Sequence, residues 1–394
     1  MIADLRQRFN ASFTPEKYRA FLDVVESRSG TPVDFRTSET PCFLPPPLLR
    51  KMCQFGRELI AQLSTPEYLA KSDRSIPPEY KVPNEAPHPL FIQVDFGLVR
   101  DSSGELQPKL VELQGFPSLY AYQPVVSQAY MDVFEVDGDL QFFLSGLDWE
   151  SYTRLLKHAI LADHDPENVI LMEIDPLQQK TLPDFLLTEK LVGIKTVDIA
   201  KIRKDGKRLF YERDGRSTPI HRIYNRAIVD ELIRRNIKLE FRLTDDLDVG
   251  WAGHPNWFFR MSKFSIPFLE HECVPESQFL GNFHDTSNLD GWVLKPLFSF
   301  AGSGIILHPK PSDLSAIPEE HRGDYILQRK MNFEPVIETP FGTTKAEVRI
   351  MYIWDQEPLP VLTIIRMGRG QMMGVDFNKK MEWVGSSAGL FPED

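Results

Sequence analysis

The chain has 394 residues, of which 42% are hydrophobic and 26% charged, so it is long enough for two or three domains with ample core. Its net charge of −11 argues against a general nucleic-acid binder but leaves nucleotide binding open, because a nucleotide needs only local positive charge. No apolar run reaches the roughly 18–20 residues of a membrane span, and the N-terminal residues lack the apolar centre of a signal peptide. The three cysteines have no metal-binding spacing and fit a reducing compartment. A cytoplasmic protein with neither nucleic acid nor membrane as partner is therefore expected.

Residues 1 to about 75 carry the spacing of amphipathic helices. Residues 15–26 place apolar side chains at helical intervals after Thr14 and Pro15, a usual way for a helix to begin. Residues 48–69 repeat the pattern after a run of prolines. Nothing in this region points to chemistry, so we expect packing helices.

Residues 89–99 and 106–113 predict two strands joined by a tight turn. In such a hairpin Asp95 and Glu112 can face one another, and Gln114 shares the face of Glu112 because side chains alternate along a strand. Three oxygen donors on one face suit a hard cation such as Mg²⁺. A solvated hairpin face with a few acids is the alternative. Glu112 lies within an apolar run, however, where an acid needs a partner, and this favours the metal site.

Strands alternate with helices in the next part of the chain, after a mostly helical pattern over residues 118–165. Strands are expected at residues 168–174, 194–198 and 222–226, a hairpin over residues 201–212, and helices at residues 182–193 and 229–235. The alternation predicts a small doubly wound module, which binds ligands beyond the carboxyl ends of its strands. Arg226 ends one such strand, so its guanidinium can form a bidentate pair with a substrate carboxylate. An ion pair with a surface acid is an equal alternative.

Residues 291–307 predict a strand, a loop of small residues and a second strand. Lys295 ends the first strand, and the glycines of the loop let backbone N–H groups approach phosphate oxygens. The arrangement fits a hairpin that closes over a polyphosphate, although an ordinary hairpin with a flexible turn fits as well. It is not the Walker pattern, because neither a helix signal nor Gly-Lys-Ser/Thr follows.

The remaining chain predicts further strands and a glycine-rich end. Strands are expected at residues 324–331, 346–353 and 360–367, and Glu347 and Arg349 share one face of the second. The glycine-rich tract at residues 368–389 is expected to be a mobile lid rather than core. Histidines form no ligand pair or triad, and Gly-x-Ser-x-Gly does not occur, so no protein nucleophile is indicated.

Four of these segments, taken in order, resemble the ATP-grasp superfamily. They are the hairpin from Val94 to Pro117, Val293-Leu-Lys-Pro296 with its loop, Tyr325-Ile-Leu-Gln-Arg-Lys-Met331, and Glu347-Val-Arg349. Because Glu112 lies far upstream of Lys295, the order is similar to that of the circularly permuted branch, which includes eukaryotic glutathione synthetase and the glutathionylspermidine synthetase-like proteins. The resemblance covers about residues 88–394.

The resemblance implies an α/β fold of the α+β ATP-grasp type, permuted, with an inserted Rossmann-like αβ substrate domain. The implied domains are an N-terminal helical region (1–87), a metal-binding strand pair of the ATP-grasp sheet (88–125), the αβ substrate domain (126–255), and the nucleotide-binding region with its glycine-rich lid (256–394). The strand pair would have to pack against the Lys295 strand in one sheet.

The resemblance also implies roles for individual residues. ATP would be bound by Lys263, Lys295, Ala301, Gly302, Ser303, Gly304, Gln328, Arg329, Lys330, Met331 and Glu334. Mg²⁺ would be held by Asp95, Glu112, Gln114 and Glu347. The acceptor carboxylate or its acyl phosphate would be bound by Arg226, Arg349, Arg366 and Arg369. Gln114 replaces the Asn that is usual in the family, and Ser299 stands where the permuted glutathione synthetases have an acid.

The implied activity is that of an ATP-dependent carboxylate–amine or carboxylate–thiol ligase acting through an acyl phosphate. The expected partners are small-molecule carboxylate and amine substrates, with a homodimer left open. A small-molecule kinase on the same fold is one alternative. The other is a nucleotide-binding protein that has lost catalysis, which the residues at positions 114 and 299 favour.

Overall fold

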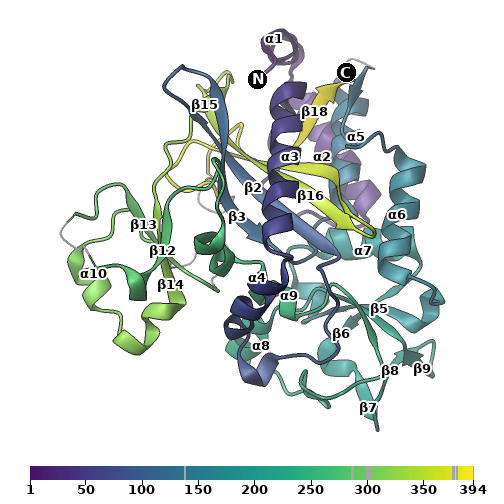
Figure 1. Ribbon diagram of the computed structural model, residues 1–394. Coiled ribbons are helices and arrows are strands. Elements are labelled where there is room, and N and C mark those ends of the chain that lie inside the picture. The colour runs from purple at the N-terminus through teal and green to yellow at the C-terminus, as the bar shows by residue number, and fades with distance from the viewer. Residues whose placement is uncertain (137–138, 285–287, 299–303, 375–377, 379, 394) are drawn as a thin grey trace.

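A mixed eight-stranded sheet forms the centre of the molecule (Figure 1). The structure, a computed structural model, describes residues 1–136, 139–284, 288–298, 304–374, 378 and 380–393. Six strands follow one another in the order β1-β18-β17-β16-β2-β3, while β15 pairs with β16 and β4 with β18. The bounds are β1 Cys42–Phe43, β2 Phe91–Arg100, β3 Leu106–Gln114, β4 Leu140–Gln141, β15 Pro335–Ile337, β16 Thr344–Trp354, β17 Pro358–Gly368 and β18 Gly385–Pro392. All pairs are antiparallel except β1 with β18.

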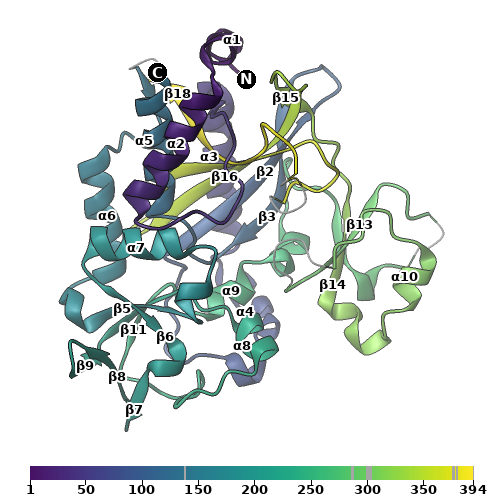
Figure 2. The ribbon, with the colours of Figure 1, turned by 180° about the vertical axis from the view of Figure 1, so that it is seen from behind.

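Alternation along the long strands divides the central sheet into two unlike faces. On one face the apolar side chains of β2 and β16, such as Val94 and Ile350, pack against helix α3 (Pro46–Gln62). The other face is covered at one end by α2 (Pro15–Ser29) and α5 (Tyr122–Phe134), as Figure 2 shows. At its other end this second face carries charged residues, which form the site described below.

The N-terminal helices pack as predicted. They are α1 (Ala3–Ser12), α2, α3 and α4 (Pro66–Ser72). In α2 the Thr14 hydroxyl accepts a hydrogen bond from the Lys17 N–H at 3.2 Å, and Gly30 ends the helix in a left-handed conformation. Phe21 and Val25 of α2 are buried against α5. In the part of the chain that the structure describes, no helix is long and apolar enough to cross a membrane.

The predicted alternation of strands and helices is confirmed as a four-stranded parallel sheet with the order β11-β10-β5-β6. Its strands are β5 Val169–Glu173, β6 Lys195–Asp198, β10 Arg222–Asn225 and β11 Gly250–Ala252. Its helices are α6 Trp149–Leu161, α7 Leu182–Val192 and α8 Val229–Arg235. A meander of β7 (Arg203–Asp205), β8 (Arg208–Arg213) and β9 (Arg216–Ile220) accompanies it. This αβ module lies at one end of the molecule (Figure 1).

The Lys295 strand belongs to a separate lobe, which corrects the expectation of one shared sheet. β13 (Trp292–Pro296) lies in a three-stranded sheet with β14 (Tyr325–Arg329) and β12 (Ser277–Phe279). This small lobe has its own core and also contains α10 (Pro311–Ser315). The expected second strand after the loop is reduced to one bridge between Leu294 and Ile306. The hairpin of β2 and β3 therefore meets β13 across two sheets.

The sequence pattern of residues 264–272 predicts a helix that Lys263 begins, and the helical segment in the structure is shorter. A short helix, α9 (Asn256–Arg260), is followed by a 3₁₀ segment, η6 (Lys263–Phe268). Pro267 lies inside η6, and proline removes a backbone donor and opposes a regular helix. The segment therefore ends before the predicted boundary at residue 272.

The prediction of a mobile glycine-rich lid is wrong for residues 385–389. They belong to β18 and are buried; residues 385–388 pair with β17, and Gly389 pairs with Cys42 of β1. Gly385 has a φ of +120°, and a Cβ there would lie 2.4 Å from the Arg36 carbonyl oxygen. A Cβ at Gly389 would lie 2.4 Å from Thr363 Oγ1. Close packing, rather than flexibility, accounts for these glycines.

Candidate functional site

Charged side chains from four separate stretches of the chain lie together on the second face of the central sheet, at the end that α2 and α5 do not cover. Cross-strand register places Asp95 opposite both Glu112 and Arg349, and Glu347 opposite Arg366. Lys263 and Lys295 reach the same place from η6 and β13. We call these seven residues the polar cluster: Asp95, Glu112, Lys263, Lys295, Glu347, Arg349 and Arg366. It contains four cations and three carboxylates.

Asp95 and Arg349 form the most buried ion pair of the polar cluster. The Arg349 guanidinium donates from Nε to Asp95 Oδ1 at 2.5 Å and from its second terminal nitrogen to Oδ2 at 2.6 Å. The two side chains are only 1% and 7% exposed. Gln93, two residues before Asp95 on the same face of β2, accepts a third hydrogen bond from Arg349 at 2.7 Å. The Arg349 guanidinium thus binds both carboxylate oxygens of Asp95 in a bidentate ion pair.

Arg366 and Glu347 extend this pair towards solvent. Arg366 donates to Glu347 Oε1 at 2.6 Å and to Asp95 Oδ2 at 3.3 Å, while its side chain is 28% exposed. Burial disfavours the charged guanidinium of Arg366, but the nearby carboxylates outweigh this and raise its pKa further. Burial also raises the pKa of Glu347, and the negative charge of Asp95 adds to this against the opposing effect of Arg366.

Glu112 is the carboxylate that faces the two lysines. Its Oε2 lies 3.6 Å from Lys263 Nζ, and its Oε1 lies 3.9 Å from Arg349. Gln114 donates its side-chain amide to Glu112 Oε1 at 2.6 Å. Burial alone would raise the pKa of Glu112, but the surrounding cations, with Lys263 the strongest, lower it to about 2. Glu112 is therefore ionised at neutral pH.

Lys295 is held by Gln328, two positions along the neighbouring strand from its register partner. The Lys295 ammonium donates to Gln328 Oε1. Because an ammonium can only donate, the Gln328 amide nitrogen must point away from it. This nitrogen is buried and has no hydrogen-bond partner among the described residues. Burial lowers the pKa of Lys295 to about 8, an effect that the charge of Glu112 opposes.

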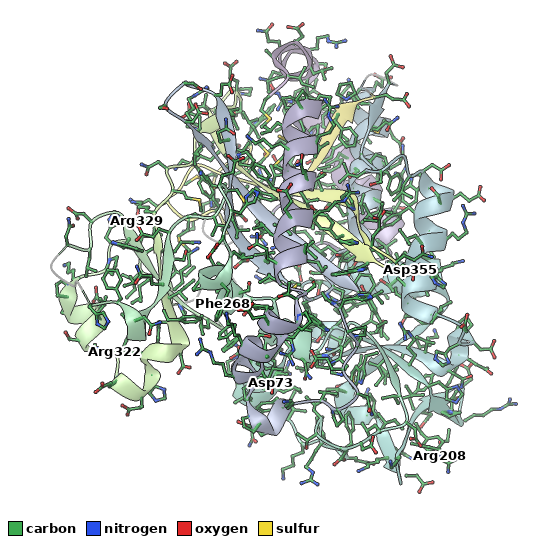
Figure 3. The ribbon with its side chains drawn as sticks, viewed as in Figure 1. Asp73, Arg208, Phe268, Arg322, Arg329 and Asp355 are labelled. Carbon is green, nitrogen blue, oxygen red and sulfur yellow. The ribbon has the colours of Figure 1, made fainter. Side chains whose placement is uncertain are left out.

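The other predicted nucleotide residues are less closely gathered. Figure 3 shows Arg329 on the small lobe; it pairs with Glu276 at 3.0 Å and lies over the Trp292 ring. Lys330 contacts His308 at 3.1 Å. Met331 is half-buried.

The loop and Glu334 complete the predicted nucleotide set. Glu334 pairs with Arg100 of the hairpin at 2.9 Å. Gly304 has a φ of +74°. Ala301, Gly302 and Ser303, and also Ser299, lie outside the described residues.

Two of the four predicted arginines lie away from the polar cluster. Arg226 is buried, donates to the Pro117 carbonyl, and packs over the rings of Phe116 and Phe185. Arg369 donates to Thr344 Oγ1 at 3.1 Å and to a backbone carbonyl at residue 382. Within the described residues, neither forms a hydrogen bond or an ion pair with a member of the cluster. Of the four arginines, only Arg349 and Arg366 join it.

Sequence reasoning missed Gln93 as a member of this face. The signal was available, because Gln93 precedes Asp95 by one alternation step in an otherwise apolar strand. The αβ module also has a cavity of about 710 Å³ beyond the carboxyl ends of β5 and β6. Asp175, Asp198, Lys201 and Arg203 are among its lining residues, and Arg226 is not.

No protein-family model and no curated protein matches the sequence. Among solved structures, the chain is similar to a glutathione synthetase-like effector from Globodera pallida, determined in its apo form. The match covers 96% of this chain and 96% of the other, with 11% sequence identity and a TM-score of 0.59. At this identity, the similarity supports a shared fold. The chain thus has a mixed α/β fold like that of a glutathione synthetase-like protein.

Proposed function

We propose that the chain is an ATP-dependent ligase of the permuted ATP-grasp type, which joins a small carboxylate to an amine or thiol. The observation that carries the proposal is the polar cluster, where two buried lysines, one from η6 and one from β13, converge on Glu112 beside Arg349 and Arg366. The unpartnered amide nitrogen of Gln328 next to Lys295 adds a buried donor that a ligand acceptor would satisfy.

The proposed reaction needs charge neutralisation and alignment rather than a protein nucleophile. In the first step a substrate carboxylate oxygen bonds to the γ-phosphorus of ATP, the bond to ADP breaks, and an acyl phosphate forms. In the second step the amine attacks the acyl carbon, phosphate leaves, and the amine loses a proton to give the amide. A thiol in place of the amine would give a thioester.

The residues of the polar cluster divide these tasks by exposure and charge. Lys263 and Lys295 would neutralise the phosphate oxygens of ATP. Arg366, more exposed than Arg349, would bind the substrate carboxylate through the guanidinium nitrogens that do not hold Glu347. Arg349 would keep Arg366 in place through their shared partner Asp95.

The residues present fit Mg²⁺ through Glu112 rather than through Asp95. Mg²⁺ in nucleotide sites uses one or two carboxylates together with phosphates and water. Glu112 has a low pKa, and Gln114 offers its amide oxygen after a side-chain flip. To bind the metal, Asp95 would have to give up its ion pair with Arg349, and Glu347 its ion pair with Arg366. Within the described ranges, no group of three or more His, Cys, Asp or Glu side chains is arranged for a metal. When bound, Mg²⁺ would neutralise charge on the β- and γ-phosphates.

A second candidate is nucleotide binding without turnover. The bidentate ion pair between Arg349 and Asp95 favours it, because Asp95 is then occupied by an arginine. A cation already lies against the carboxylate that the sequence predicted as a metal ligand. This version keeps the lysines and the small lobe for ATP and dispenses with the transfer step.

The test is release of ADP and phosphate from ATP and Mg²⁺ in the presence of pooled amino acids and polyamines. Substrate-dependent release with a new amide product supports the ligase, and the Glu112→Gln variant should abolish it while ATP binding weakens modestly. A stable phosphorylated small molecule would identify a kinase. ATP binding with no turnover in any pool would support the second candidate, and absence of ATP binding would refute both.

A further inference from the structure

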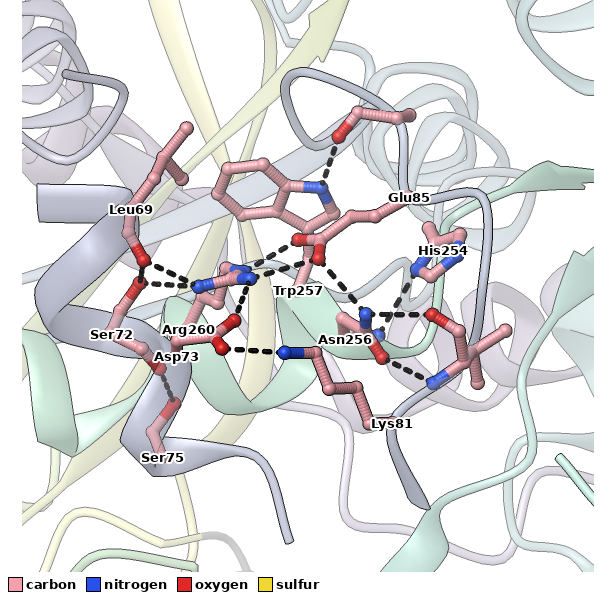
Figure 4. A network of polar contacts seen from close by, with 12 residues as sticks. Leu69, Ser72, Asp73, Ser75, Lys81, Glu85, His254, Asn256, Trp257 and Arg260 are labelled. Carbon is pink, nitrogen blue, oxygen red and sulfur yellow. Dashed lines mark hydrogen bonds and ion pairs between the residues drawn. The ribbon is translucent and has the colours of Figure 1, made fainter. Parts of the chain in front are cut away.

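Arg260 is the centre of a buried polar network between α9 and the segment that precedes β2 (Figure 4). Its guanidinium donates to both oxygens of Glu85, at 2.5 and 2.9 Å, and to Asp73 Oδ1 at 2.9 Å. It also donates to the Ser72 hydroxyl at 2.8 Å and to the Leu69 carbonyl at 2.9 Å. Five hydrogen bonds thus use the whole donor capacity of a side chain that is 7% exposed.

All of these partners belong to one connecting segment, residues 69–86, which runs from α4 to the stretch before β2. The rest of α9 binds the same segment. Asn256 exchanges hydrogen bonds with the backbone of Val82 at 2.9 and 3.0 Å, and the Trp257 indole donates to the Ala86 carbonyl at 3.2 Å. The sequence predicted only packing helices in the N-terminal region. In the structure, side chains of α9 bind this region by hydrogen bonds, and these hold α9 in place.

α9 is in turn joined to the two elements that supply Glu112 and Lys263. The Gly115 N–H, directly after β3, donates to the Met261 carbonyl at 2.9 Å. A Cβ at Gly115 would lie 2.7 Å from the Trp257 carbonyl oxygen, so β3 and α9 approach as closely as a glycine allows. Lys263 begins η6 only three residues after Arg260, and its ammonium lies 3.6 Å from Glu112.

We propose that Arg260 is a positioning residue for Lys263. The arginine anchors α9 on one side to residues 69–86, and α9 sets the start of η6, so the network determines where the Lys263 ammonium lies relative to Glu112. A misplacement of about 1 Å at a charged group costs as much as 100-fold in a positioned reaction, so such an anchor has functional weight. The inference rests on the proposed function in assigning Lys263 to phosphate, but the placement of Lys263 itself can be tested without a nucleotide.

The network has no surplus charge that would recommend it as a ligand site. Glu85 and Asp73 face Arg260, and Asp73 also pairs with Lys81. Two carboxylates therefore meet two cations. Equal numbers of opposite charges indicate a structural role rather than a ligand site. Two variants test this role. Arg260→Lys keeps the positive charge but loses the planar guanidinium that binds both oxygens of Glu85, and Glu85→Gln keeps the side-chain shape but loses the negative charge.

The first measurement is the acetylation rate of Lys263 in the protein without ligand, by mass spectrometry at low conversion, relative to Lys295. The side chain of Lys263 is 9% exposed. Arg260→Lys should raise this relative rate several-fold, and Glu85→Gln should raise it less. The matched control is Arg222→Lys, which removes the guanidinium of a partly buried arginine that donates to the carbonyls of Ile160 and Ala159 in the αβ module. The control should leave the ratio unchanged.

The second measurement is ATP affinity in a double-mutant cycle with Lys263→Met. Arg260→Lys should weaken ATP binding about tenfold when Lys263 is present and should have no further effect in the Lys263→Met background. An equal loss in both backgrounds, or an unchanged acetylation ratio in both Arg260→Lys and Glu85→Gln, would overturn the inference. If the unaltered protein does not bind ATP, the proposed function fails, and the acetylation ratio alone decides the role of Arg260.

Discussion

The buried pair of Asp95 and Arg349 makes a prediction that does not depend on any ligand. Replacing Asp95 by Asn keeps the shape but leaves the Arg349 guanidinium, 7% exposed, without its carboxylate. Removing one partner of a buried ion pair costs about 3–5 kcal/mol, because the remaining charge stays in a poorly solvated place. The two short hydrogen bonds, 2.5 and 2.6 Å, and the third member Arg366 at 3.3 Å, put Asp95 in this class. We therefore expect Asp95→Asn to lower the free energy of unfolding by about 3–5 kcal/mol.

The assay is urea unfolding followed by circular dichroism, for Asp95→Asn, Arg349→Met and the double variant. Because the double variant leaves neither charge of the pair, it should lose at least about 2 kcal/mol less than the two single losses added together. The exposed pair of Arg154 and Glu150, at 3.2 Å with side chains 70% and 85% exposed, is the control. Its coupling should stay below about 0.5 kcal/mol. A coupling at Asp95 and Arg349 no larger than this control would refute the reasoning.

Three further predictions concern the buried lysine and a buried glycine. Lys295→Ala should weaken ATP binding by roughly 2–4 kcal/mol, measured by titration calorimetry, because it removes an ammonium from a closed site; an unchanged affinity would refute the phosphate role. ATP affinity should fall as the pH rises past about 8, because burial lowers the pKa of Lys295 to about 8 and the ammonium then loses its proton; Lys295→Met should remove this fall. Gly385→Ala should lower the melting temperature sharply, because residue 385 has a φ of +120° and the new Cβ would lie 2.4 Å from the Arg36 carbonyl oxygen. Gly104→Ala is the control: the space around it is open, so the protein should lose only the stability that corresponds to the backbone strain at a φ of +85°.

Sequence patterns located most elements because their signals are local. The helix Val229–Arg235 begins and ends where the spacing of apolar residues predicted, and the helix Trp149–Leu161 lies within the predicted helical stretch of residues 118–165. The sequence indicated that Asp95 and Glu112 can face one another, but alternation alone did not predict the register, because a register shift between Asp95 and Phe96 brings Asp95 opposite Glu112. The charged residues of β16 were likewise placed on one face.

The errors came from properties that depend on distant neighbours. Glycines at positions 385 and 389 suggested mobility, yet they allow β18 to pack against Arg36 and Thr363, contacts that no local pattern contains. The separation of β13 from the central sheet depends on strand pairing across hundreds of residues. The pairing of Asp95 with Arg349 was also invisible, because two acids on facing strands indicate a cation without saying whether it is a metal or a guanidinium.

The charge of the polar cluster would allow an acidic chain to bind an anion at the proposed site. The chain carries a net charge of −11, whereas the cluster sets four cations against three carboxylates. Because burial also raises the pKa of Glu347, any protonation of that residue makes the cluster more positive. Charges at the protein surface are screened over about 8–10 Å by salt, while the buried ones act on one another with less screening. Anion binding at the proposed site would therefore be governed by these seven side chains and not by the net charge. Each carboxylate also keeps the neighbouring cations together before an anion arrives, which reduces the electrostatic cost of preparing the site.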